Sequence, residues 1–345
     1  MTEPKYITME KIAIIIANYN GRAFLEVSIP AILKSTYSNF NLIVCDDAST
    51  DNSMEYLRQL QQQDNRVILL QNETNKGAAA TRNYAVTKAE ESLLIFLDND
   101  TEVDPGWIEP LIKLLSSDKT IGGVQSTLID YHNRDTIQLT GTHLIPHVFW
   151  SIPLEAGQKV SWRIRESREI IALSAAMAVR KDVFINVKGF DEVLGVYTED
   201  IEFSLRIWIS GYRIVSCPES IVYHWTKRVE DRKSMFATKE RIYFHLAKNS
   251  IRSILKNYEL KHVIYYLPVA VFVITARMAI VIKNSDTSVI KGTVKGLVWS
   301  LFNFGSTLKV RNEVESIIRK TSDTEIMKKV FTKKNLITIY KEYFT

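Results

Sequence analysis

The feature that most constrains the fold is an alternation of short apolar runs with segments of helical periodicity in the first hundred residues. Four five-residue runs are almost wholly apolar and rich in β-branched side chains, at 12–16, 41–45, 66–70 and 93–97. Such runs are typical of strands covered on both faces of a sheet. Between them, apolar residues recur three and four positions apart, as in amphipathic helices, at 24–36, 52–63 and 77–89. The order βαβαβαβ predicts an α/β fold built on an open parallel sheet.

The residues that follow each run are the candidate ligand contacts, because open parallel sheets bind ligands beyond the carboxyl ends of their strands. After the fourth run come Asp98, Asn99 and Asp100. Two carboxylates one residue apart at a strand end can share Mg²⁺ or Mn²⁺ through oxygen ligands. Asp and Asn are also common in solvated turns, so this segment by itself leaves both interpretations open.

Length and composition are those of a globular protein with about two domains. The 345 residues are 24% charged and 46% hydrophobic, which excludes fibrous and disordered classes. Cys45 and Cys217 lie far apart, in or beside apolar runs, which favours two reduced core thiols over a disulfide framework or a zinc site. The apolar run near the N-terminus is too short for a secretory signal, and we expect a cytoplasmic protein.

Charge divides the chain into two regions. Residues 226–345 carry 23 Lys and Arg against 10 Asp and Glu, a net charge of +13, whereas residues 1–225 carry a net charge of −8. Asymmetry of this kind predicts regions with different partners. We place the boundary at residues 226–233, where charges cluster and the apolar periodicity stops. The prediction is an α/β domain over 1–225 and a basic, mostly helical region over 226–345.

The basic region contains two apolar stretches that predict contact with a membrane surface. Residues 263–282 include a single charge, Arg277, and residues 289–305 mix lysines with aromatic side chains. An Arg at the centre of a helix disfavours a bilayer span by about 2.5 to 3.5 kcal/mol. We therefore expect peripheral attachment to the anionic inner face of the cell membrane, with a bilayer span and a soluble helical subdomain as alternatives. The apolar stretches fit lipid better than a nucleic acid, and we expect no nucleic-acid partner.

Seven segments, in order and with plausible spacing, resemble the family 2 glycosyltransferases of the GT-A fold, particularly the rhamnosyltransferase-like members. They are "IIIANYNG", "NLIVCDDASTDNS", "NKGAAATRN", "FLDNDTEVDPGW", "AAMAVRKDVFINVKGFDE", "TEDIEFSLRIWISGYRI" and "VYHW". The resemblance covers about residues 11–225 and implies a Rossmann-like domain that binds a nucleotide-diphosphate sugar. The chain departs from the family pattern at "LSAAMAVR", residues 173–180, where a glycine commonly opens the motif.

The resemblance identifies residues 98–100 as the metal-binding DxD motif of the family. It implies that Asp100 ligates Mg²⁺ or Mn²⁺, that Asp98 lies near the donor's ribose or the ion, and that Asn99 lies at the sugar nucleotide. It also implies His224 as a further metal ligand, although a lone His is more often structural. A cation at the donor diphosphate would stabilise the negative charge that develops on the leaving group.

The same resemblance implies further residues at the nucleotide. The exit of the first strand would present backbone from Ala17 to Tyr19 to the base and ribose. Asp47 would hydrogen-bond the nucleobase, with a helix N-cap as its alternative role. Arg82 would lie near the nucleotide, with a solvated helix surface as its alternative.

On the acceptor side, an alcohol must lose its proton as it attacks the anomeric carbon. The family's ED motif assigns Asp200 as the general base, with Glu199 supporting it on the acceptor side. Asp200 begins a segment whose apolar stripe, Ile201, Leu205 and Trp208, predicts an amphipathic helix. Without the resemblance, acids that complement a helix dipole would be the favoured explanation of this pair. Asp191 would hold an acceptor hydroxyl, with an ordinary turn as its alternative.

Together these inferences predict an inverting, metal-dependent glycosyltransferase. It would move a sugar from a nucleotide-diphosphate donor to a hydroxyl of a lipid-linked glycan or surface polysaccharide. Two alternatives stay open: a catalytically silent module that binds a nucleotide sugar, and a soluble glycosyltransferase that does not dock on membranes.

Overall fold

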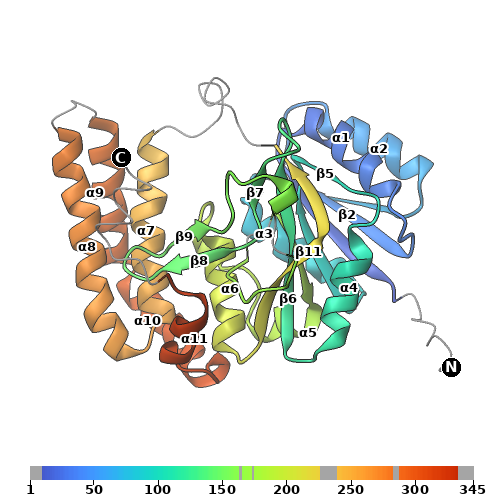
Figure 1. Ribbon diagram of the computed structural model, residues 1–345. Helices are drawn as coiled ribbons and strands as arrows, with labels where there is room; N and C mark the ends of the chain where they lie inside the picture. Colours follow the sequence, from blue (N-terminus) through green and yellow to red (C-terminus); the bar gives the residue numbers. More distant parts are fainter. Residues whose placement is uncertain (1–9, 163–164, 173–174, 226–238, 283–286, 333–345) are drawn as a thin grey trace, which may run out of the picture.

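A mixed nine-stranded sheet forms the centre of the α/β part of the molecule (Figure 1). The computed structural model describes residues 10–162, 165–172, 175–225, 239–282 and 287–332. Along the sheet the strand order is β3-β2-β1-β4-β10-β6-β11-β5, and β7 pairs with β6. The strands are β1 Ile12–Asn18, β2 Phe40–Asp46, β3 Val67–Gln71, β4 Leu93–Asp98, β5 Thr101–Val103, β6 Ile121–Asp130, β7 Ile137–Leu139, β10 Ala176–Arg180 and β11 Arg213–His224. A separate hairpin pairs β8 Thr142–Ile145 with β9 Trp150–Pro153.

The four strands expected from the apolar runs are present and parallel to one another. In β1, Ile15 lies beside Ile43 of β2 and Phe96 of β4. Its side chains alternate between two core clusters, because Ile14 and Ile16 pack on one face of the sheet and Ile15 on the other. Burial on both faces explains why these runs contain no polar alternation, and each fully buried side chain of this kind contributes roughly 1.5 to 3 kcal/mol.

Beyond the four parallel strands that the sequence predicts, the sheet is mixed. β10 runs antiparallel between β4 and β6, and β5 runs antiparallel to β11. Ala176, the first residue of β10, lies opposite Leu97 near the end of β4. β10 starts at the edge of the sheet where β4 ends. β10 therefore runs in the direction opposite to β4.

Helices cover both faces of the sheet, as the α/β prediction required. α1 Arg22–Leu33, α2 Ser53–Gln63 and α4 Ile108–Ser117 pack on one face, and α3 Ala78–Lys88, α5 Lys181–Asn186 and α6 Glu199–Ile209 on the other. Two short 3₁₀ turns are η1 Val160–Trp162 and η2 Glu192–Leu194. The cysteines are free and buried, as expected for core thiols. The GT-A class of α/β fold expected from the sequence is thereby formed, with strand ends converging on one edge.

The remaining helices stand beside this domain (Figure 1). They are α7 Lys239–Asn257, α8 Leu260–Ile282, α9 Thr287–Phe302, α10 Phe304–Glu313 and α11 Asp323–Val330, with a π-helical turn at Val314–Ile318. Ile251 and Ile254 of α7 belong to the same core cluster as Phe203 of α6. The helical region therefore shares a core with the sheet, and the boundary expected at 226–233 lies outside the described residues.

Two glycines explain how closely α9 packs on α7. A Cβ on Gly292 would lie 2.2 Å from the carbonyl oxygen of Glu240, and one on Gly296 would lie 2.7 Å from that of Phe244. Only glycine permits such an approach between helix backbones. Of the helices that the structure describes, none combines the length and apolarity needed to cross a bilayer.

Candidate active site

The acidic motif and His224 meet at the carboxyl edge of the sheet. Asp98 is the last residue of β4, and Asp100 follows it in the turn to β5. The three side chains offer ligand atoms that all lie within 4.8 Å of one another, and His224 Nε2 is 3.4 Å from Asp100 Oδ1. Two carboxylates and an imidazole, each half-buried, form a donor set suited to a divalent metal. Asp98, Asp100 and His224 therefore fit the metal site that the sequence predicts.

Strand pairing brings His224 to the motif. β11 lies antiparallel to β5, and the register places His224 beside Thr101, the residue after Asp100. His224 Nδ1 lies 2.8 Å from Oε1 of Gln138, a residue of β7 that sequence reasoning missed. In the neutral ring that donates from Nδ1 to this oxygen, the lone pair is on Nε2, the atom near Asp100, where it could ligate a metal.

Arg82 connects the metal-site residues to the expected general base. It is 5% exposed on α3, and its guanidinium lies 2.5 Å from Asp98 Oδ1 and 3.5 Å from Glu199 Oε1. The alternative of a solvated helix surface is therefore wrong for Arg82. Asp98, Glu199 and Asp200 all act electrostatically on this one cation, so negative charge remains in excess. An excess of this kind favours binding of a divalent cation.

Glu199 and Asp200 open α6, as the amphipathic pattern predicts, with Ile201, Leu205 and Trp208 buried. Asp200 is half-buried and its Oδ1 accepts from the backbone N–H of Ile201 at 2.8 Å. Burial raises the pKa of Glu199 to about 8, and the charge of Asp200 acts in the same direction, while Arg82 opposes both. The helix thus presents two adjacent carboxyl groups that prefer to share one negative charge.

A pH-dependent stability follows from Glu199. Its folded pKa of about 8 exceeds the ordinary value of 4.5, so the stabilisation is fully present below about pH 4.5 and is lost as pH rises through 8. We expect the unfolding free energy of the wild type, relative to Glu199→Gln, to fall across this window by a few kcal/mol. Urea unfolding of both proteins from pH 5 to 9, with EDTA present, measures the difference. A pH-independent difference would contradict the raised pKa.

The loop after β2 is organised by its two acids. Asp46 is fully buried and accepts from Asn18 Nδ2 at 2.9 Å and from Ser49 Oγ at 2.6 Å. Asp47 accepts from Asn72 Nδ2 and from the backbone N–H groups of residues 76 and 77, each at 2.8 Å. It therefore does not cap α2, and it fixes the approach to α3. A contact of Asp47 with the nucleobase stays a prediction.

The exit of β1 lies against the acidic motif. Asn99 Nδ2 donates to Asn18 Oδ1 at 2.8 Å, and a Cβ on Gly21 would lie 2.1 Å from the same Asn99 nitrogen. Ala17 is half-buried beside Asp98 in the sheet register, and the Tyr19 side chain is 41% exposed. The structure thus brings Ala17, Tyr19 and Asn99 to one edge, where nucleotide contacts by them stay predictions.

Asp191 lies in a different environment from the one expected. Its carboxylate accepts from Lys256 Nζ at 2.7 Å and from Arg252 Nε at 3.1 Å, and its side chain is 7% exposed. It also caps η2 through the N–H of Val193. Because α7 occupies both oxygens of Asp191, we withdraw its assignment to an acceptor hydroxyl.

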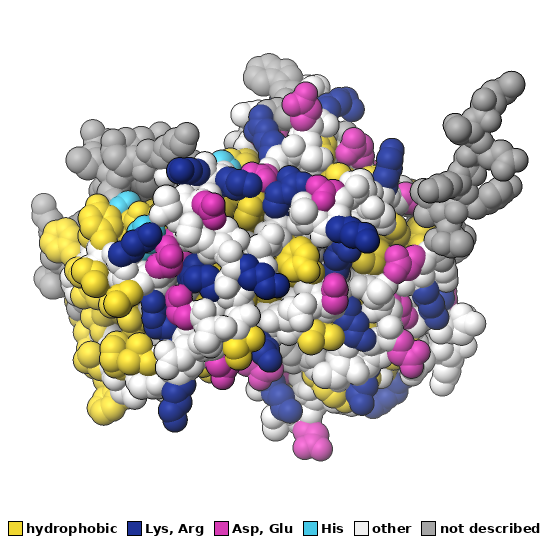
Figure 2. Space-filling view, turned by 90° about the horizontal axis from the view of Figure 1, so that it is seen from below, with side chains coloured by type: hydrophobic (Ala, Val, Ile, Leu, Met, Phe, Trp, Pro, Cys, Tyr) yellow, Lys and Arg dark blue, Asp and Glu magenta, His cyan; other side chains and the backbone are white. Residues whose placement is uncertain are grey.

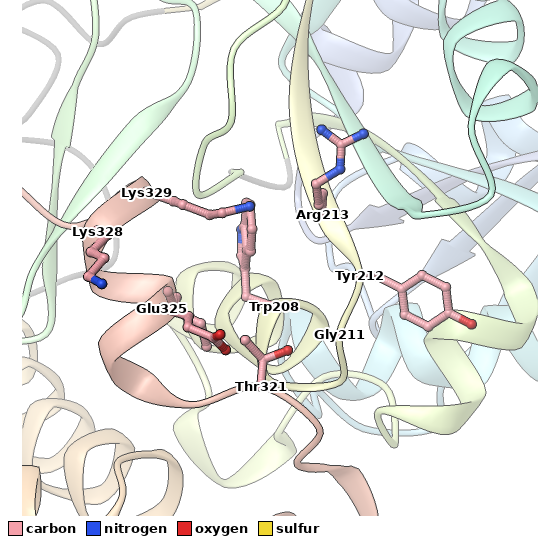
Figure 3. Close-up of a pocket in the computed structure, with 9 residues that line it drawn as sticks. Trp208, Gly211, Tyr212, Arg213, Thr321, Glu325, Lys328 and Lys329 are labelled. Carbon is pink, nitrogen blue, oxygen red and sulfur yellow. The ribbon is translucent and has the colours of Figure 1, made fainter.

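A pocket of about 330 Å³ lies elsewhere, between the end of α6, the start of β11 and α11 (Figure 3). Arg213 begins β11 whereas His224 ends it, so the pocket is at the opposite edge of the sheet from the metal-site residues. Lys329 lies over the Trp208 ring, and both Lys329 and Arg213 pair with Glu169. Arg213 and Lys329 of this pocket already have an acidic partner, and we assign the pocket no role in donor binding.

The fold and the carboxylate-rich strand edge define the class as GT-A glycosyltransferases. The chain matches the model of glycosyl transferase family 2 over residues 13–185, about half of its length, and it belongs to this family. The family resemblance seen in the sequence is confirmed.

Curated relatives align over parts of the chain. The Escherichia coli "UDP-Glc:alpha-D-GlcNAc-diphosphoundecaprenol beta-1,3-glucosyltransferase WfgD" is 43% identical over 89 residues, which are 26% of this chain and 34% of that protein. The Myxococcus xanthus "O-antigen biosynthesis protein RfbC" is 28% identical over 222 residues, 62% of this chain and 17% of the relative. The chain thus spans about a third or less of the length of these relatives.

Solved structures show the same fold at low sequence identity. The mannosyltransferase PcManGT of Pyrobaculum calidifontis, in complex with GDP-Man and Mn²⁺, gives a TM-score of 0.55 at 16% identity, covering 89% of this chain and 85% of its own. Staphylococcus aureus TarS in complex with UDP-GlcNAc gives a TM-score of 0.54 at 19% identity, covering 76% and 71%. These likenesses support the GT-A fold.

Proposed function

We propose that this protein is an inverting glycosyltransferase that moves a sugar from a nucleotide-diphosphate donor to a hydroxyl of a lipid-linked glycan. The observation that carries the proposal is one connected cluster of side chains. Arg82 bridges Asp98 of the acidic motif and Glu199, which is adjacent to Asp200 on α6. Arg82, a buried cation, thus joins the donor-binding side of the cluster, at Asp98, to the proton-accepting side, at Glu199 and Asp200. A module that only binds a nucleotide sugar would not need the proton-accepting side.

Each side of the cluster has a distinct task. Asp200 would accept the proton of the acceptor hydroxyl as its oxygen attacks the anomeric carbon, and the bond to the nucleotide diphosphate breaks on the opposite side. A single displacement of this kind inverts the anomeric configuration. Arg82 would hold Asp98 in place and offset the repulsion between the two carboxyl pairs. Glu199, with its raised pKa, would keep a proton at neutral pH and leave the negative charge on Asp200.

Asp98, Asp100 and His224 would hold Mg²⁺ or Mn²⁺. The fit rests on their ligand atoms lying within 4.8 Å of one another and on Gln138 orienting the imidazole. When bound, the ion supplies positive charge that stabilises the departing diphosphate.

The names of relatives suggest the substrate class. WfgD is named for UDP-glucose and a diphosphoundecaprenol-linked acceptor, and PcManGT and TarS were solved with GDP-Man and UDP-GlcNAc. We infer a polyprenyl-diphosphate-linked sugar as acceptor. The test incubates the full chain and Mn²⁺ with UDP-, TDP- and GDP-sugars, with and without a synthetic acceptor of this kind, and measures nucleotide release. Acceptor-dependent release from one donor supports the proposal, and no release from any donor contradicts it.

We further infer that the helical region docks peripherally on an anionic membrane, at the face where such an acceptor is presented. Large apolar side chains are exposed on α8, α9 and the start of α10: Leu260, Ile264, Tyr265, Val271, Phe272, Val294, Val298, Leu301, Phe302 and Phe304. Figure 2 shows hydrophobic side chains gathered at the left of the molecule, over this part of the chain. We call these residues the apolar face.

Helix geometry and charge support lipid as the occupant. Val294, Val298 and Leu301 follow one another at helical spacing, on the side of α9 away from the glycines that pack on α7. Exposed lysines adjoin the face, Lys261 and Lys295 among them, although these two also pair with Glu259 and Glu240 respectively. Apolar residues beside cations are typical of helices lying at an anionic lipid surface. Each Lys or Arg near such a surface contributes about 1 kcal/mol to the free energy of membrane binding.

Replacing two of these side chains should release the protein from lipid. We expect Leu301→Glu/Phe302→Glu to lower binding to phosphatidylglycerol-containing liposomes at least about tenfold, because two apolar side chains that would enter the lipid are exchanged for carboxylates that an anionic surface repels. Sedimentation with liposomes measures binding. Ile185→Glu, which alters an exposed apolar residue on α5, outside the apolar face, is the control. Unchanged liposome binding by the double variant would contradict membrane docking. If the double variant kept liposome binding but lost a dimer that the wild type forms, the apolar face would be the contact with a second copy of the chain.

A further inference from the structure

The catalytic helix α6 is preceded by a strained turn. Tyr197 and Thr198 have φ values of 63° and 64°, in the left-handed region that residues with a Cβ rarely adopt. They immediately precede Glu199 and Asp200. Two consecutive residues in this conformation cost free energy, so surrounding contacts must hold them there.

The contacts come from the helical region. Asn249 of α7 is fully buried, and its side-chain nitrogen donates to the carbonyl oxygens of Val196 at 2.9 Å and Tyr197 at 2.7 Å. The neighbouring Lys248 donates to the carbonyl oxygens of Val193 and Leu194 at 2.6 and 3.2 Å. One helix therefore holds four of the five carbonyls that lead into the turn.

Buried ion pairs fix both ends of this segment on α7. Lys256 lies 2.7 Å from Asp191, before the turn, and 2.9 Å from Glu202, after it. Glu202 is on the first turn of α6 and is fully buried, with Arg206 as a second partner. The position of α6 relative to the sheet thus depends on α7.

We propose that Asn249 is a positioning residue for transfer: it holds the Tyr197–Thr198 turn and thereby sets the placement of Glu199 and Asp200. The inference rests on the proposed function. Asn249 acts through the backbone and touches neither donor nor acceptor. The geometry selects it over Lys248 because only Asn249 contacts a carbonyl of the turn itself.

The test compares kinetic constants of full-length variants, with the donor and acceptor found in the nucleotide-release panel. We expect Asn249→Ala to lower kcat about 10- to 100-fold while the KM for the donor changes less than about threefold, since a base displaced by about 1 Å loses the reaction but not the nucleotide site. Asn303→Ala is the matched control, because Asn303 also donates one side-chain amide to a carbonyl of the helical region, at 2.9 Å. The control should keep wild-type kcat.

A second variant separates positioning from general destabilisation. Thr198→Gly accepts a positive φ without a Cβ penalty, so the turn needs less support from α7. In the Thr198→Gly background, Asn249→Ala should lower kcat no more than about threefold. The effect of Asn249→Ala on kcat would then be smaller than in the wild type, a difference that a general loss of stability would not produce. Equal losses in both backgrounds, or a wild-type kcat for Asn249→Ala, would overturn the inference. A wild type that releases no nucleotide would instead refute the proposed function on which it rests.

Discussion

The Asp200→Asn variant should transfer sugar at least about 100-fold more slowly than the wild type while it binds nucleotide and Mn²⁺ nearly as well. Loss of a general base costs about 10² to 10⁴ in rate, because a neutral amide cannot take the proton of the attacking hydroxyl. The substitution is isosteric, and the oxygen that accepts from the N–H of Ile201 is retained. Stopped or single-turnover measurement of transfer, with nucleotide affinity measured separately, gives both quantities.

Asp182→Asn provides a closely matched control. Asp182 also lies in the first turn of a helix, α5, and its Oδ1 accepts from the next backbone N–H at the same 2.8 Å. It should keep wild-type transfer, because it lies outside the cluster around Arg82. If Asp200→Asn transferred sugar as fast as this control, another group would be the base, and Glu199 would be the first to examine.

The parts of the site that the sequence could predict are those set by local order. A continuous apolar run buried on both faces fixes a strand, and in parallel strands the residues that follow it share one edge. Asp47, Asp98 and Asp100 were found in this way. Asp200 was assigned by the resemblance to the family's ED motif, whereas the stripe of Ile201, Leu205 and Trp208 predicted only the helix that it begins.

The parts that could not be predicted depend on pairing between distant segments. His224 reaches Asp100 only because β11 lies antiparallel to β5, and Gln138 orients its ring only because β7 lies at the same edge. Such pairings are decided by tertiary packing and leave no local periodicity. The resemblance to a known family pointed to His224, whereas nothing pointed to Gln138.

The prediction for Asp191 failed for a related reason. The segment after Gly189 has the residues of an exposed turn, and only the docking of α7 places Lys256 and Arg252 on that carboxylate. Burial would raise the pKa of Asp191, but the two cations outweigh it and hold this pKa well below the ordinary value. Asp191 therefore links the loop after Gly189 to α7 of the helical region through these two ion pairs. The contact of Asn249, on the same helix, with the turn before α6 could not be predicted from the sequence, because a single Asn in an amphipathic pattern does not indicate which segment it contacts.

The Asp100→Ala variant should lose the dependence of nucleotide binding and transfer on Mn²⁺, with transfer lowered at least about 100-fold. A Lewis-acid cation contributes several kcal/mol to stabilising a departing diphosphate, and 1.36 kcal/mol corresponds to a factor of ten in rate. Asp98 already bonds to Arg82, and His224 already bonds to Gln138, so removal of Asp100 leaves too few carboxylate oxygens for a hard cation. The fold should persist, because Asp100 is half-buried in a turn and its backbone carbonyl, which accepts from the N–H of Trp225, is kept when the side chain that pairs with His224 is removed.

Isothermal titration of UDP and GDP, with and without Mn²⁺, measures the loss directly. Asp104→Ala is the control, since this acid lies in the same chain segment and its carboxylate accepts from the backbone N–H of Gly106. The control should titrate with Mn²⁺ as the wild type does. If Asp100→Ala still bound nucleotide more tightly with Mn²⁺ than without, and transferred sugar at the wild-type rate, the metal would not be held by Asp98, Asp100 and His224. Transfer would then have to rely on a protein cation such as Arg82 to stabilise the leaving diphosphate.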